Sequence, residues 1–195
     1  MAATQQRITY DELYEMPDDG ILYELLDGEL VTRAAPTFRH QQAVSRLDRL
    51  RAPVEEAGHG IVVVGPFDVV LDQYNMTLPD LIFVRSERQG IVTDIGCHGA
   101  PDLIVEVVSP TSVERDWEDK RTTYQRFGVR SYWIIDLIGQ AVHRLDLVDG
   151  RYVERQPLRP GDALTSSLFP GLALDVGRLF ARGGAGERLQ APAQG

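Results

Sequence analysis

The sequence has a single cysteine, a single lysine and no long apolar run. Cys97 has no second cysteine to pair with, which excludes an internal disulfide framework. No apolar run approaches the roughly 18–20 residues of a membrane-spanning helix. The first twenty residues, MAATQQRITYDELYEMPDDG, lack the apolar core of a secretory signal. These absences predict a soluble cytoplasmic protein.

Positive charge is also scarce. The formal net charge is −9 and the pI is near 4.9, so we expect no large, uniformly basic surface for duplex DNA, although local basic patches are compatible with this charge. Of the 20 basic residues, Lys120 is the only lysine. Because an ammonium is a compact point charge and a guanidinium is planar, this position could specifically need lysine. Biased base composition is the alternative explanation.

The length of 195 residues fits one domain. A chain of this size buries about 70 % of its unfolded surface, so it needs neither disulfides nor metal to fold. We expect a single domain over residues 1–181 and a disordered tail over 182–195, where the sequence is RGGAGERLQAPAQG.

Hydrophobic periodicity and turn residues predict alternating helices and strands. The expected elements are a short helix at 8–16, a hairpin at 21–33, a helix at 38–57 that Pro53 bends or ends early, strand at 61–65 and 67–72 as one bent strand, strands at 78–85 and 100–110, a helix at 112–127, a strand at 131–137, a hairpin at 141–156, and a strand with a short helix at 164–180. Capping boxes are expected at Thr9 with Glu12 and at Thr111 with Glu114. A strand, helix and strand in succession at 102–137 indicate a crossover unit in a mixed sheet, hence an α/β fold.

The strand at 100–110 is apolar with one acid in its middle. Because side chains alternate along a strand, Asp102 and Glu106 would share one face. Burying an unpaired carboxylate costs several kcal/mol, so Glu106 needs a cation, a proton or a metal ion. A purely structural pairing with an arginine is the alternative.

One face of the following helix carries, at spacings of three, four and three, Trp117, Lys120, Tyr124 and Phe127. Three large aromatics identify this face as the one that packs on the sheet. The only lysine should therefore point inward or along the edge of the buried face. An ion pair with Asp116, or a side chain that extends to solvent, are the alternatives.

Asp80 lies at the start of the preceding strand, where its carboxylate could converge with that of Glu106. Two hard oxygen ligands with water suit Mg²⁺ or Mn²⁺. A lysine beside them could orient a water or stabilise negative charge on a phosphate. Asp80 in a Pro-Asp turn is the alternative. The candidate catalytic residues are thus Asp80, Glu106 and Lys120, with the two acids as metal ligands.

Several segments, in order, resemble one protein family. These are YELLDGELV at 23–31, the P-x-x-x-H at Pro36 to His40, PDLIFV at 79–84, GAPDLIVEVVSPTS at 99–112 and DWEDKRTTYQRFGVRSYWIID at 116–136. They look like the Uma-two family of bacterial restriction endonucleases, within the P-D-(D/E)-X-K nuclease superfamily, over roughly residues 10 to 180. The resemblance implies a restriction-endonuclease-like core, with a mixed central sheet flanked by helices and added hairpins near both ends. It also implies metal-dependent cleavage of phosphodiester bonds.

Carried over by position, Asp80 resembles the motif aspartate and Glu106 the acid of (D/E)-X-K. The motif lysine would fall at position 108, which is Val108 here. Lys120 resembles the migrated lysine found in branches of the superfamily.

Three secondary candidates accompany these residues. Glu24 and His40 match family positions near the expected site, although a histidine at a helix start is often a surface residue. Asp102 is an alternative metal ligand, or simply the start of a strand.

Other enzyme classes lack their motifs. The four histidines show no zinc spacing, and Cys97-His98 has no further ligands nearby in sequence. There is no P-loop, no G-x-G-x-x-G after a strand and no G-x-S-x-G.

Two hypotheses therefore remain. The first is a Mg²⁺-dependent endonuclease that cleaves DNA, as a homodimer because two strands are cut most simply by two sites. The second is a catalytically degenerate, dimeric nucleic-acid-binding or regulatory module, which the net charge slightly favours. Local arginines could still contact phosphates; they are Arg39, Arg46, Arg49, Arg51, Arg121, Arg126 and Arg130.

Overall fold

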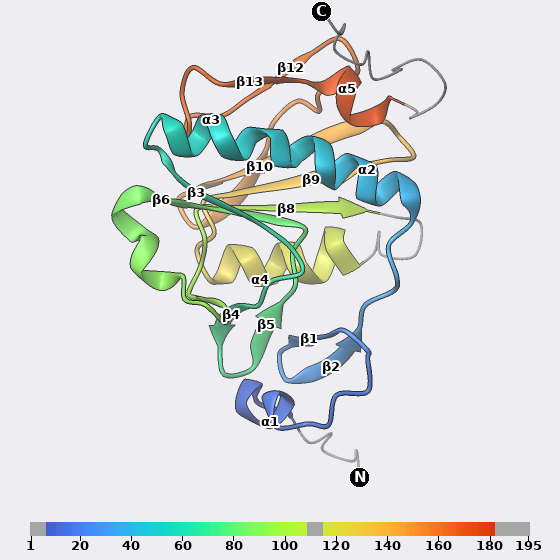
Figure 1. Ribbon diagram of the computed structural model, residues 1–195, viewed down its shortest axis with the longest axis vertical. Coiled ribbons are helices and arrows are strands. Elements are labelled where there is room, and N and C mark those ends of the chain that lie inside the picture. The colour runs from blue at the N-terminus through green and yellow to red at the C-terminus, as the bar shows by residue number, and fades with distance from the viewer. Residues whose placement is uncertain (1–6, 109–114, 182–195) are drawn as a thin grey trace, which may run out of the picture.

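A computed structural model describes residues 7–108 and 115–181 (Figure 1). The predicted capping box at Thr111 and Glu114 and the predicted tail at 182–195 lie outside these residues. The helices are α1 (Tyr10–Tyr14), α2 (Phe38–Leu47), α3 (Arg51–Glu56), α4 (Lys120–Arg126) and α5 (Val176–Phe180), with 3-10 turns at Asp48–Leu50 and Ser86–Ile91 and a π-helical turn at Arg115–Asp119. In the described part of the chain, no helix is long and apolar enough to span a membrane.

A six-stranded mixed sheet forms the centre of the fold. Its order is β11 (Arg151–Glu154), β10 (Ala141–Val148), β9 (Ser131–Asp136), β8 (Leu103–Val108), β6 (Leu81–Arg85) and β3 (Gly60–Val64). The pair β8 and β9 is parallel, and α4 connects the two, as the predicted crossover requires. The fold is thus the expected mixed α/β arrangement.

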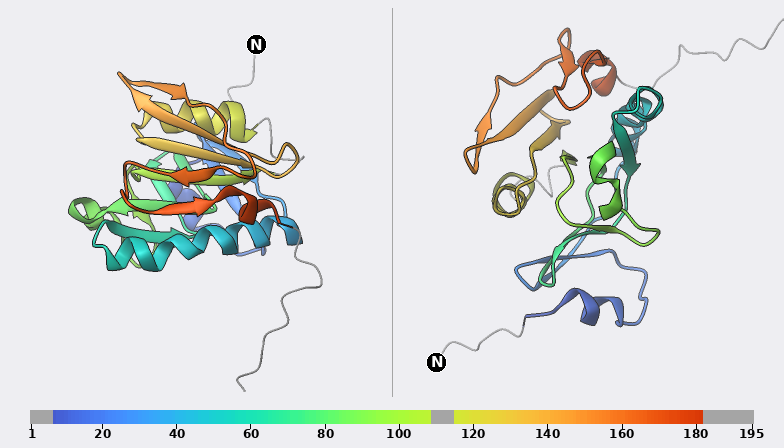
Figure 2. Two further views of the ribbon diagram at one scale, coloured as in Figure 1. Left: turned by 90° about the horizontal axis from the view of Figure 1, so that it is seen from above. Right: turned by 90° about the vertical axis from the view of Figure 1, so that its left-hand side faces the viewer.

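Helices cover both faces of this sheet (Figure 2). The continuous layer of α2 and α3 lies on one face, and α4 lies on the other. The alternation along β8 matches these layers, because Val105 belongs to the same core cluster as residues of α2 and α3, whereas Ile104 packs in the cluster that contains Tyr124 of α4. Glu106 has the same parity as Ile104 and therefore faces α4.

A second sheet lies beside the first, with the order β2 (Glu29–Thr32), β1 (Tyr23–Leu26), β5 (Asn75–Thr77), β4 (Val69–Asp72) and β7 (Cys97–His98). The predicted hairpin is present as β1 and β2, and Asp27 and Gly28 form its turn with positive φ angles. A third, two-stranded sheet pairs β12 (Ala163–Thr165) with β13 (Ala173–Asp175).

Two local predictions need correction. The segments at 61–65 and 67–72 are not one bent strand, because β3 pairs in the central sheet and β4 pairs in the second sheet. Of the two effects expected of Pro53, an early end of the helix is wrong, because α3 continues to Glu56 after the 3-10 turn at Asp48–Leu50. Pro53 lies in the first turn of α3, where a backbone N–H is not needed for an intrahelical bond.

Candidate functional site

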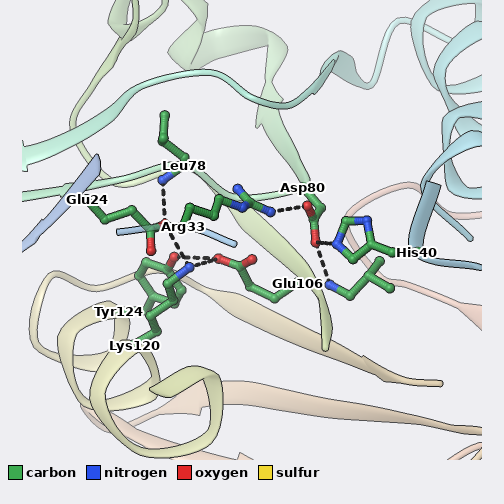
Figure 3. Close-up of polar contacts among 9 residues, drawn as sticks. Glu24, Arg33, His40, Leu78, Asp80, Glu106, Lys120 and Tyr124 are labelled. Atoms are coloured by element: carbon green, nitrogen blue, oxygen red, sulfur yellow. Dashed lines mark hydrogen bonds and ion pairs between the residues drawn. The ribbon is translucent and has the colours of Figure 1, made fainter. Parts of the chain in front are cut away.

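Side chains from both sheets and two helices meet at one end of β8 and form a polar cluster (Figure 3). The central sheet contributes Glu106 on β8 and Asp80 immediately before β6. The second sheet contributes Glu24 on β1 and Arg33 immediately after β2. The helices contribute His40 on α2, and Lys120 and Tyr124 on α4.

The two strands that carry the predicted acids are neighbours, as expected. Leu81 pairs with Val105 in the antiparallel ladder of β6 and β8, so Asp80 and Glu106 are the next residues along the same register. In addition, Oδ2 of Asp80 accepts a hydrogen bond of 2.7 Å from the backbone N–H of Val107. The structure therefore places the two acidic residues opposite each other at neighbouring strands of the central sheet.

Lys120 points inward, as the stripe on its helix predicts. Its Nζ lies 2.9 Å from Oε1 of Glu106 and 2.8 Å from Oε1 of Glu24, and the residue is only 2 % exposed. This burial rules out the alternative in which the side chain extends to solvent. The side chain of Asp116, the other proposed partner, lies outside the described part of the structure.

Tyr124 adds a hydroxyl to this buried group. It lies one turn after Lys120 on α4 and donates a hydrogen bond of 3.0 Å to the same Oε1 of Glu106. Complete burial, with the charges of Glu106 and Glu24 nearby, holds the pKa of Tyr124 well above its usual value. The hydroxyl thus remains protonated and acts as a hydrogen-bond donor to the carboxylate.

Asp80 is held by three donors. Oδ1 accepts from Nη2 of Arg33, and Oδ2 lies 3.1 Å from Nε2 of His40 in addition to the Val107 bond. Burial alone would raise the pKa of Asp80, but the contact with His40 and the charge of Arg33 hold it below its usual value. Asp80 is therefore ionised at neutral pH.

Glu24 is buried in the same manner, with 1 % of its surface exposed. Oε1 accepts from the backbone N–H of Leu78 at 2.8 Å as well as from Lys120. Burial would raise the pKa of Glu24, but the charge of Lys120 and these hydrogen bonds lower it overall. Both secondary candidates with a family match, Glu24 and His40, therefore lie within the cluster.

Asp102 does not belong to this cluster. It lies four residues from Glu106, roughly 13 Å along an extended strand. Its completely buried carboxylate contacts Arg85 at 2.9 Å, Arg88 at 3.0 Å and Arg130 at 3.4 Å. A shared strand face was therefore not enough to place Asp102 near Glu106, because a strand face is long compared with a metal site.

Arg33 is a member of the cluster that the sequence did not reveal. Its backbone N–H donates to the carbonyl of Leu22, so it extends the hairpin ladder by one pair and shares the hairpin face of Glu24. Burial alone would lower the pKa of Arg33, but the carboxylates of the cluster raise it overall, so the guanidinium is permanently charged. Nothing in a single sequence distinguishes this arginine from the other eighteen.

A pocket of about 340 Å³ opens beside Asp80. His40 and Arg33 line it together with Asp80, whereas Lys120 and Glu106 are not among its lining residues. His40 Nδ1 is buried and, within the described residues, has no hydrogen-bond partner. The pocket is therefore a route by which a ligand could reach the Asp80 side of the cluster.

The donor set fits a hard divalent cation in its chemistry. Asp80 and Glu106 offer carboxylate oxygens from neighbouring strands, and Mg²⁺ commonly takes one or two carboxylates while water and substrate phosphates complete its shell. Among residues 7–108 and 115–181, no group of three or more His, Cys, Asp or Glu side chains is arranged to hold an ion. The described protein ligands would therefore be these two carboxylates.

Two predicted phosphate contacts are engaged within the protein. Arg39 donates to the backbone carbonyl of Leu137 at 3.3 Å. Arg46 donates to the carbonyls of Leu179 at 3.1 Å and Ala181 at 2.7 Å. These two arginines tie α2 to neighbouring segments, so the helix does not present a free row of cations.

A family model and a solved structure that resemble this chain are both described as nucleases. The Uma2 family model, described as "Putative restriction endonuclease", matches residues 10–177. Among solved structures, the chain is similar to one described as "a putative nuclease belonging to DUF820 from Anabaena variabilis", with a TM-score of 0.72 and 18 % identity over 89 % of this chain and 97 % of that one. No curated protein matches. At this identity, the solved structure supports the fold.

Proposed function

Because the chain belongs to the Uma2 family of restriction-endonuclease-like proteins, we propose that it is a metal-dependent endonuclease, a hydrolase that cleaves phosphodiester bonds in DNA. One observation carries the proposal. Lys120 on α4 lies 2.9 Å from Glu106 on β8, and Asp80 occupies the adjoining strand position. Two acids and one lysine in this arrangement are the polar groups that such a reaction needs.

Asp80 and Glu106 would hold Mg²⁺ or Mn²⁺. The bound cation supplies Lewis acidity at the phosphate and makes the attacking water more acidic. The ammonium of Lys120 would position that water or stabilise the charge that develops on the phosphate. Tyr124 and Glu24 would orient the reacting groups indirectly, because each contacts Glu106 or Lys120.

The reaction is a simple hydrolysis. The oxygen of water forms a bond to phosphorus and releases a proton to solvent, the bond from phosphorus to one sugar oxygen breaks, and that oxygen receives a proton from solvent. A homodimer would place two such sites on the two strands of a duplex. A DNA substrate is consistent with a cytoplasmic location.

The test uses the full chain with supercoiled plasmid and with single-stranded circular DNA. Each is incubated with EDTA, Mg²⁺ or Mn²⁺, and products are resolved on agarose. We expect nicked, linear or fragmented DNA only with the divalent cation, and no cleavage by Glu106→Gln. Glu29→Gln, an exposed change on β2, is the matched control and should cleave normally. Cleavage that persists in Glu106→Gln would show that a contaminant or another site is responsible.

A second candidate is a catalytically degenerate nucleic-acid-binding or regulatory module. The observation that favours it is the engagement of both oxygens of Asp80 by Arg33, His40 and Val107. Titration with Mn²⁺ distinguishes the two functions, because a degenerate site would bind no cation. Light scattering at tens of micromolar tests the dimer that both candidates include.

A further inference from the structure

The charge balance of the cluster singles out Arg33. Apart from His40, the cluster contains the carboxylates of Glu24, Asp80 and Glu106 and the cations Lys120 and Arg33. Counted over the described residues, this gives one excess negative charge in a largely buried region. A bound dication would turn the excess into one positive charge, so one of the two resident cations would no longer be needed there.

The two resident cations differ in freedom. The side chain of Lys120 is 3 % exposed and is held between two carboxylates. The side chain of Arg33 is 19 % exposed, and among residues 7–108 and 115–181 its ion pair is with Asp80. Arg33 also lines the pocket beside Asp80, and Figure 3 shows its side chain reaching across from the hairpin toward that acid.

From this difference we propose that Arg33 is a displaceable counterion. It neutralises Asp80 in the absence of a divalent cation, yields that carboxylate when the cation binds, and then contacts the substrate phosphate from the pocket. The inference rests on the proposed function. A guanidinium is suited to both partners, because its planar fork matches carboxylates and phosphates alike.

The movement requires only the side chain. The backbone of Arg33 stays in the hairpin ladder through its bond to Leu22. Its side chain rotates within a pocket of about 340 Å³, which provides the room. Arg33 would thus compete with the cation before the reaction and assist the phosphate during it.

The test compares wild type with Arg33→Gln and with Arg39→Gln, using the full chain. Arg39 is on α2, next to His40, and its loss changes the net charge equally without removing a contact to Asp80. Affinity for Mn²⁺ alone is measured by isothermal titration calorimetry, and single-turnover cleavage is measured on the substrate form that wild type cuts.

We expect Arg33→Gln to bind Mn²⁺ about tenfold more tightly, because the competing charge is gone, and to cleave at least about tenfold more slowly. Arg39→Gln should change the Mn²⁺ affinity less than about twofold, as screened surface charges do. A merely structural role for Arg33 cannot move affinity and rate in opposite directions. Unchanged or weaker binding in Arg33→Gln would overturn the displacement, and tighter binding with undiminished cleavage would overturn the phosphate contact.

Two further outcomes keep the proposals separate. If no protein binds Mn²⁺ or cleaves DNA, the proposed function and this inference both fail; if wild type does both and Arg33→Gln matches it, only the inference fails. Should Arg33→Gln fold poorly, its melting temperature with and without Mn²⁺ replaces calorimetry. A displaceable counterion predicts a larger rise on adding Mn²⁺ than in wild type, and an equal or smaller rise would overturn it.

Discussion

Val107 donates its backbone N–H to Oδ2 of Asp80 across 2.7 Å, so the strand that carries Glu106 also fixes the carboxylate of its neighbour. This bond joins two positions that are 27 residues apart in sequence. It acts on Asp80 together with the side chains of Arg33 and His40. The spacing of the two acids therefore depends on the register of β6 and β8 rather than on a flexible loop.

Glu106→Gln should abolish both Mn²⁺ binding and DNA cleavage, because one of the two carboxylate ligands is lost. Calorimetry measures the binding, and plasmid nicking measures the cleavage. The amide can still accept hydrogen bonds from Lys120 and Tyr124, so the fold should be retained, which circular dichroism verifies. Retained metal binding in this variant would remove Glu106 from the ligand set.

Lys120→Ala should reduce the cleavage rate by about 10² to 10³, the usual scale for one electrostatic stabiliser, while Mn²⁺ still binds. Lys120→Arg should not restore the rate, because a planar guanidinium does not fit the position that the ammonium occupies between Glu24 and Glu106. Single-turnover assays measure both variants. Full activity in Lys120→Arg would show that only the positive charge matters.

Glu24→Gln should destabilise the protein most at neutral pH. The folded-state pKa of Glu24 lies below its ordinary value of 4.5, so the unfolded state binds more protons as the pH falls below that value. The stability that this carboxylate contributes is present above pH 4.5 and is lost as the pH falls toward the folded pKa. Urea unfolding at pH 7, 5, 4 and 3.5 should show the difference between wild type and variant shrinking, and a constant difference would contradict the assignment.

Asp102→Asn should lower the free energy of unfolding by about 3 kcal/mol, since it removes the buried partner of three arginines. It should leave Mn²⁺ binding and cleavage unchanged. Glu87→Gln is the matched control, because Glu87 contacts the same Arg85 at 2.9 Å but is exposed, and exposed pairs contribute about 1 kcal/mol or less. A loss of metal binding in Asp102→Asn would return this residue to the list of ligands.

The parts of the site that follow from local periodicity could be predicted from the sequence. Alternation along β8 turns Glu106 toward α4, and the helical stripe turns Lys120 toward β8. The two patterns together therefore indicate that these side chains face each other. The capping box at Thr9 and Glu12 is also present as predicted. These features depend on residues only a few positions apart.

The rest depends on long-range pairing, which periodicity does not encode. The hairpin of β1 and β2 pairs with β5, and this contact carries Glu24 and Arg33 to the cluster. The separation of β3 and β4 into different sheets was missed for the same reason, because both segments have the composition of one continuous strand. Asp102 shows a different error. Strand alternation predicts which face of the strand it shares with Glu106, but not that the two residues lie close together along that face.

The hairpin that supplies Glu24 and Arg33 adds no net charge to the cluster. Its acid pairs with Lys120 from α4, and its base pairs with Asp80 from the central sheet. The hairpin therefore supplies one negative and one positive charge, and each of them pairs with a residue from a different layer of the fold. Neutral replacements of both Glu24 and Arg33 leave the net charge of the cluster unchanged. A neutral replacement of only one of them leaves Lys120 or Asp80 without its partner from the hairpin.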